Sequence, residues 1–285
     1  MGTESNDSYE EFLWKNFNLG TELNASGSFI YIALYFFDQM TGFNHEADIF
    51  EFLYNTSFGI ERLEKIAIIL LHHKNVKDQT TFEKQLKTHN HKELLERIKE
   101  SVEIKFDKKH NEFISLLNNY KSARYHRFNL SSVQIPNNYK SDFINFMEKR
   151  LGVKIDLGVF PTPNDDNIKI LIGKVVGFIV TQLYDIIHIE ASKQNLYTYE
   201  LPYDSKAYKI FIRKEFDFIK EKNLKKELLI FLINNKNQND YTNFIKTIDP
   251  LPFDDALTKE YINFLLNPHK GIDIIDEMES LYEND

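Results

Sequence analysis

The sequence predicts an all-α protein, a multi-helix bundle built from two helical subdomains. Apolar residues recur three or four positions apart along almost the whole chain, and the strict alternation typical of strands is scarce. The 285 residues include 24 phenylalanines and 15 tyrosines. Aromatic side chains gain much free energy from burial, so this content favours a folded chain over a disordered one.

Composition excludes several classes of function. The chain has no cysteine, which excludes disulfides, zinc–thiolate sites and a cysteine nucleophile, and this fits a cytoplasmic protein. The formal net charge of −8 is unlike that of a uniformly basic nucleic-acid binder. Acidic residues gather between Asp254 and Asp285. We interpret this end as a solvated helix, and the alternative is a binding segment for a protein partner.

The first subdomain, residues 1–155, is expected to be a run of helices punctuated by glycine and polar turns. Asp7 or Ser8 can cap the first helix. Gly42 and Gly59 are expected to separate later helices, because glycine often marks a helix end. The helices predicted after the first lie at residues 28–39, 44–54, 60–73, 79–88, 91–102, 107–125 and 136–151.

A linker is predicted at residues 156–167, where DLGVFPTPNDDN combines two prolines, a glycine and clustered Asp and Asn. A long apolar helix follows at 165–192, and its internal charges predict a buried helix rather than a membrane span. Its Gly173-x-x-x-Gly177 spacing predicts close packing against a neighbouring segment. The second subdomain, 168–285, continues with helices at 205–221, 223–235, 240–247, 254–267 and 271–282.

The histidine pairs of the chain do not have the spacing of a metal site. His72-His73, His89-x-His91 and the His188-x-Glu190 pair all lack the three- or four-residue step that places two ligands on one helix face. We interpret them as exposed or capping side chains. No phosphate-binding glycine loop or serine-hydrolase motif is present either, so the sequence predicts no metal and no cofactor.

The strongest functional candidate is a basic and aromatic stretch that ends the helix predicted at 107–125. Phe113, Leu116, Leu117 and Tyr120 define the buried stripe of that helix, and its continuation reaches Arg124 and Arg127. An arginine on such a stripe must be paired or must line a cleft. Contact with RNA phosphates and bases is therefore predicted for Lys121, Arg124, Tyr125, His126 and Arg127. The alternative is structural, with Arg124 paired to Glu61 or Glu64.

The two segments GIERLEKIAIILL and FISLLNNYKSARYHRF together resemble the HEPN domain, over roughly residues 20–150. HEPN proteins are helical bundles of bacterial toxin–antitoxin, abortive-infection and phage-defence systems. In that family an Arg-x4–6-His motif forms a metal-independent ribonuclease site, usually completed across a homodimer. Here His126 stands only two residues after Arg124, and Leu130 and Ser131 occupy positions where the histidine is expected.

The resemblance implies a HEPN-like scaffold that binds RNA or a nucleotide in the cytoplasm, in a bacterial defence or stress system, and is not catalytic. Two alternatives stay open. The first is a non-enzymatic helical interaction protein with structural arginines. The second is a metal-independent endoribonuclease that uses His126 across a dimer.

Overall fold

The computed structural model describes residues 9–74, 76–123, 128–130, 139–234, 239–266 and 272–283. All regular structure in these ranges is helical and none is a strand, which confirms the predicted all-α class. The chain divides into two compact units, Met1–Asp217 (unit 1) and Phe218–Asp285 (unit 2). Each unit is described by itself.

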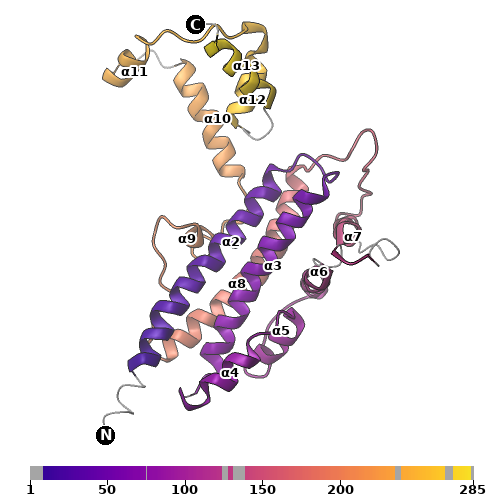
Figure 1. The fold of residues 1–285 in the computed structure, drawn as a ribbon, viewed down its shortest axis with the longest axis vertical. Helices are drawn as coiled ribbons and strands as arrows, with labels where there is room; N and C mark the ends of the chain where they lie inside the picture. Colours follow the sequence, from indigo (N-terminus) through magenta and orange to yellow (C-terminus); the bar gives the residue numbers. More distant parts are fainter. Residues whose placement is uncertain are drawn as a thin grey trace. The chain divides into compact units, whose positions relative to one another are not determined.

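Three long helices form the centre of unit 1: α2 (Leu19–Gln39), α3 (Glu46–His72) and α8 (Asp166–Lys193). They lie side by side, and α3 packs against both α2 and α8 (Figure 1). The rings of Phe37, Phe52 and Phe143 meet in the core at centroid distances of 4.8 and 5.4 Å. The remaining elements of unit 1 are η1 (Trp14–Asn18), η2 (Val76–Asp78), α4 (Gln79–Gln85), α5 (His91–Lys99), α6 (Lys108–Ala123), α7 (Tyr139–Leu151) and α9 (Lys206–Phe211).

The helix break predicted at Gly59 is wrong, whereas Gly42 does lie between two helices, α2 and α3. Residues 44–54 and 60–73 belong to one helix, α3, which continues through Gly59, and α2 begins nine residues before the predicted start at Ser28. A Cβ atom on Gly59 would lie 2.6 Å from Cγ1 of Ile30. Gly59 therefore serves the close approach of α2 and α3 instead of ending a helix.

Residues 156–167, the predicted linker, lie inside unit 1. The Asn164 side-chain amide donates to the carbonyl oxygen of Phe37 at 2.6 Å, and the Asn164 backbone N–H donates to that of Thr41 at 2.9 Å. These bonds fix the segment to the end of α2, and α8 then packs along α3. Residues on both sides of the segment thus share one core, and the chain divides at Asp217 instead.

Helix α8 has the buried character that the sequence predicts. It is the one helix among the described residues with the length and apolar composition to cross a membrane, and 56% of its most apolar stretch is buried within the protein. The prediction of close packing at Gly173 and Gly177 is confirmed, because a Cβ atom on either would come within 2.5 Å of Phe216.

Unit 2 consists of α10 (Ile219–Asn234), α11 (Asp240–Ile245), η5 (Asp255–Leu257), α12 (Thr258–Leu266) and α13 (Ile272–Glu283). They correspond to the helices predicted at 223–235, 240–247, 254–267 and 271–282. The helix predicted at 205–221 differs from the structure. Helix α9 ends at Phe211, and Lys214 follows with a positive φ of 52°. The prediction of one continuous helix from 205 to 221 is therefore wrong, because the left-handed backbone at Lys214 cannot continue a right-handed helix.

Candidate functional site

Helix α3 carries a row of polar side chains on a face that is largely buried. Ser57, Glu61 and Glu64 are four and three residues apart, so they lie on one side of the helix. All three are buried. Buried carboxylates require hydrogen-bond partners, and the segment that precedes α5 supplies them.

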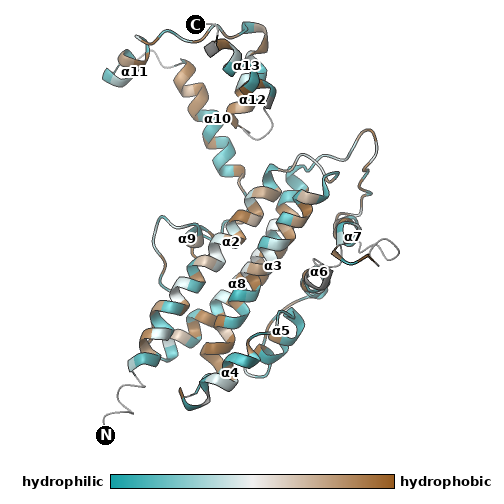
Figure 2. Ribbon diagram, in the orientation of Figure 1, coloured by the Kyte–Doolittle hydropathy of each residue, from teal (hydrophilic) through white to brown (hydrophobic). Residues whose placement is uncertain are grey.

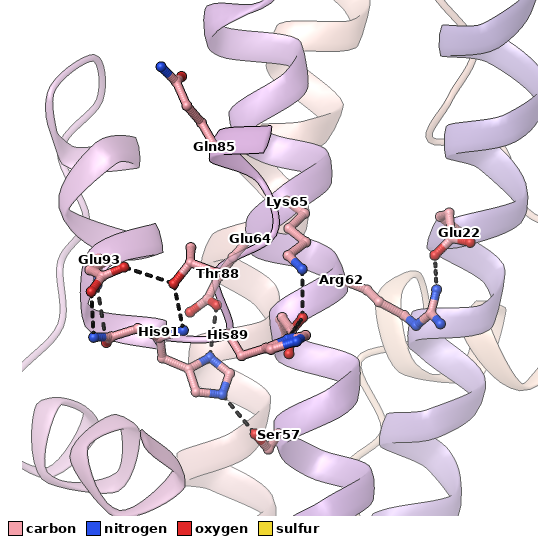
Figure 3. Close-up of polar contacts among 12 residues, drawn as sticks. Glu22, Ser57, Arg62, Glu64, Lys65, Gln85, Thr88, His89, His91 and Glu93 are labelled. Atoms are coloured by element: carbon pink, nitrogen blue, oxygen red, sulfur yellow. Dashed lines mark hydrogen bonds and ion pairs between the residues drawn. The ribbon is translucent and has the colours of Figure 1, made fainter. Parts of the chain in front are cut away.

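Two histidines face α3 there: His89 just before the extended cap residue Asn90, and His91 as the first residue of α5. Asn90 caps α5, since its side chain accepts hydrogen bonds from the backbone N–H groups of Lys92 and Glu93. The φ and ψ of Asn90, −86° and 104°, are extended. In extended backbone, residues two apart point to the same side. His89 and His91 therefore both reach α3 (Figure 3).

His91 joins Ser57 and Glu64 in a buried chain of hydrogen bonds. Its Nδ1 lies 2.8 Å from Oε2 of Glu64, and its Nε2 lies 2.8 Å from Oγ of Ser57. Burial raises the pKa of Glu64, and the neighbouring His91 offsets part of that shift. A serine, a histidine and a carboxylate in this order also form hydrolase triads. Here Ser57 is 1% exposed and His91 is 0% exposed, so no substrate reaches the hydroxyl and the cluster joins α5 to α3.

Glu61 forms a second cluster closer to the surface. Its Oε1 atom accepts from Nζ of Lys65 at 2.7 Å and lies 2.8 Å from Nδ1 of His89. Burial is the main cause of a lowered pKa for Lys65; the nearby Arg62 lowers it further and Glu64 raises it. This cluster forms one wall of a pocket.

The pocket has a volume of about 520 Å³, within the usual range for small-molecule sites. Its walls come from η1, α2, α3 and the segment between α4 and α5. They combine aromatic and aliphatic side chains with two cations and two carboxylates: Trp14, Asn18, Leu19, Glu22, Phe58, Glu61, Arg62, Lys65, Ile66, Ile69, Leu86 and His89.

Arg62 is the best-positioned charged group of the pocket. Its guanidinium lies 4.7 Å from the ring centre of Phe58 and 5.5 Å from that of Phe29, and it pairs with Glu22 across the gap from α3 to α2 (Figure 3). Burial lowers the pKa of Arg62, although a guanidinium stays charged at any physiological pH. The Glu22 side chain is 46% exposed and that of Arg62 is 28% exposed, so the carboxylate is the more exposed partner.

Most of the RNA-contact residues predicted from the sequence lie outside the residues that the structure describes. Lys121 belongs to α6, but its side chain lies outside the described residues, as do Arg124, Tyr125, His126 and Arg127. The buried stripe predicted before them is confirmed, because Phe113, Leu116, Leu117 and Tyr120 are all buried.

The alternative ion pairs of Arg124 stay a prediction. Glu61 has Lys65 and His89 as partners, and Glu64 has His91. The sequence predicts a structural role for both carboxylates but places His89 and His91 at the surface or as capping side chains. The missed signal was the His-x-His spacing, which places two imidazoles on one side of extended backbone.

The described residues contain no group of three or more His, Cys, Asp or Glu side chains arranged to hold a metal ion. No protein-family model matches the chain, and neither the curated proteins nor the solved structures include one with significant similarity to it.

Proposed function

We propose that this is a non-catalytic binding protein whose pocket holds a nucleoside monophosphate or an organic anion of similar size and shape. The observation that carries the proposal is the setting of Arg62. Two aromatic rings hold its guanidinium in place, while its partner Glu22 is nearly half exposed. A phosphate can replace the Glu22 carboxylate with little rearrangement of Arg62, and guanidinium groups bind phosphate through paired hydrogen bonds.

The rest of the pocket suits a flat, apolar ligand body. Trp14 and Phe58 offer partly exposed aromatic rings, and Ile66, Ile69 and Leu86 line the apolar wall. Lys65 stands three residues after Arg62 on α3, so a second cation lies on the same side of the helix. A nucleotide combines an aromatic base with a phosphate, which matches both parts of this lining.

Intrinsic fluorescence tests this proposal directly, because Trp14 is the only tryptophan of the chain and lines the pocket. Titration with adenosine monophosphate is expected to change the Trp14 emission in a saturable way. Adenosine and inorganic phosphate are each expected to bind more weakly. Arg62→Ala is expected to weaken binding of the monophosphate by about tenfold or more, because a charge-assisted contact is lost.

The matched control is Arg150→Ala. Arg150 also pairs with a carboxylate, Glu112, and lies 5.8 Å from the ring centre of Phe146, but it does not line this pocket. The control is expected to bind like the unmodified protein. No saturable change in Trp14 emission, or equal losses in both variants, would reject the proposal.

A second candidate function is RNA binding by a HEPN-like protein through Lys121, Arg124, Tyr125, His126 and Arg127. One feature of α3 favours it. Phe50, Tyr54 and Phe58 stack along the helix at 6.3 and 5.7 Å with nearly parallel rings. Phe50 contacts Tyr120 at 5.3 Å, immediately before the basic stretch in sequence. Partly exposed stacked rings offer platforms for bases.

This candidate predicts that the full chain binds a single-stranded RNA oligonucleotide and that binding weakens at higher salt. Arg124→Ala/Arg127→Ala is expected to reduce both the affinity and its salt dependence. Tyr54→Ala is expected to reduce affinity by about tenfold through lost stacking, and Tyr203→Ala, at another exposed tyrosine of unit 1, is the control. Equally negligible binding by all these proteins would rule out RNA as the ligand.

A cytoplasmic place in a bacterial defence or stress system is proposed on the HEPN resemblance and the cysteine-free composition alone. The ribonuclease alternative depends on His126. Cleavage of RNA in the presence of EDTA by the unmodified protein but not by His126→Ala is the result that it requires.

A further inference from the structure

Unit 2, taken by itself, leaves apolar side chains exposed that an ordinary domain of its length would bury. Beyond Phe218, none of the residues that the structure describes is buried. Large apolar side chains are exposed on α10, α11, η5, α12 and α13. Monomeric proteins rarely expose contiguous apolar patches of more than a few hundred Å². A binding partner for this surface is therefore expected.

Helix α10 shows what kind of partner is needed. Its first nine residues, 219–227, carry four lysines and two glutamates, and the uninterrupted apolar run Leu228–Ile233 follows. Figure 2 shows the same contrast between a hydrophilic and a hydrophobic half. Side chains of six consecutive helical residues point in all directions. Ile230, Phe231, Leu232 and Ile233 are each more than half exposed. A helix that is apolar all round needs neighbours on several sides, as in a multi-helix core.

The charges of α10 and α13 are complementary, as a contact between two copies of the chain requires. Helix α13 carries two aspartates and three glutamates and no lysine or arginine, whereas the lysines of α10 outnumber its glutamates. In a symmetric pair each contact occurs twice, so α10 of each copy can meet α13 of the other. Unit 2 as a whole is acidic, with 13 acidic and 8 basic residues. This balance opposes an anionic membrane surface, and six apolar residues are too short to span a bilayer.

We propose that unit 2 is a homodimerisation module in which α10 of one copy packs against the acidic α13 of its partner. The apolar second half of α10 and the exposed Ile275 and Met278 of α13 then enter a core shared by two chains. This inference is independent of the pocket ligand, because no residue of unit 2 lines the pocket beside Arg62.

Charge reversal gives a test that distinguishes association between copies from docking within one chain. In Lys225→Glu/Lys226→Glu, both helices of the contact are acidic. In Asp273→Lys/Asp276→Lys/Glu279→Lys, α13 carries three lysines against two glutamates, so both helices of the contact are basic. Each full-length variant alone is expected to dimerise at least about tenfold more weakly than the unmodified chain. An equimolar mixture is expected to recover association as a heterodimer, because both contacts in the mixed pair are then between opposite charges.

The measurements are sedimentation equilibrium of each protein and of the mixture. Phe231→Glu is expected to abolish dimers, since it places a charge in the shared apolar core. Phe160→Glu, at an exposed aromatic residue of unit 1, is expected to leave them intact. A monomer at all concentrations would overturn the proposal, as would a mixture no more associated than its components. Binding of the monomer to phosphatidylcholine vesicles, lost in Phe231→Glu, would instead identify a lipid surface as the partner.

Discussion

Replacement of His91 by alanine is expected to lower the free energy of unfolding by about 2–5 kcal/mol, because the change leaves buried polar groups without their partner and empties a buried site. The reason is that two buried polar side chains lose a hydrogen-bond partner when the imidazole is removed. Glu64 is fully buried and Oε2 of this side chain loses its partner at 2.8 Å, while Ser57 loses the acceptor or donor at the other ring nitrogen. Urea unfolding followed by circular dichroism measures the change.

Two further variants separate the pair from the general effect of losing a histidine. His72→Ala removes a partly buried histidine that contacts the carbonyl oxygen of Arg97, and a much smaller loss is expected. Ser57→Ala/Glu64→Leu/His91→Leu replaces all three members of the buried chain by apolar side chains, and it is expected to recover most of the stability, because none of the three polar groups is left without its partner. Equal destabilisation by His72→Ala and His91→Ala would show that the buried chain of hydrogen bonds adds little to the free energy of unfolding.

The second large effect is expected at Gly27, where α2 crosses α9. A Cβ atom on Gly27 would lie 2.4 Å from Cβ and 2.5 Å from Cα of Ala207. The Cα atom belongs to the backbone, so α9 itself must move to admit the methyl group. Gly27→Ala is therefore expected to cost about 2–3 kcal/mol of stability.

Gly20 provides a control on the same helix. A Cβ atom there would meet only the carbonyl oxygen of Thr198, at an ordinary 3.7 Å. Gly20→Ala is expected to raise stability by up to about 1 kcal/mol, because alanine is the better helix former. Thermal melts of the two variants should shift in opposite directions, and a gain in both would show that the α2–α9 crossing tolerates a methyl group.

Much of the fold follows from local pattern. The bounds of α8, α11 and α13 agree with the predicted helices to within a few residues, because their apolar periodicity and caps are local properties. The role of Gly59 could not be predicted, for the opposite reason. Whether a glycine ends a helix or allows another helix to approach depends on a neighbour that is distant in sequence, and single-sequence patterns do not specify that neighbour.

The candidate pocket was less predictable than the fold. Glu61 and Glu64 were recognisable as charges on a largely apolar helix, but their histidine partners lie 28 and 27 residues away, on either side of the extended cap residue Asn90. The role of Arg62 depends on Phe29 and Glu22 of α2, about forty residues earlier. Such sites arise from packing between helices, and no periodicity within one helix reveals them.

The anchoring of residues 156–167 by Asn164 also bears on how the protein can be divided. A fragment that ends at residue 155 would lack α8, whose apolar side fills the groove along α3. The exposed Val159 and Phe160 mark a place where the chain can be cut without opening the core. The two resulting pieces would each hold part of one hydrophobic interior. Residues 156–163 are thus suited to a split-protein reporter, in which the fold reassembles from complementary halves.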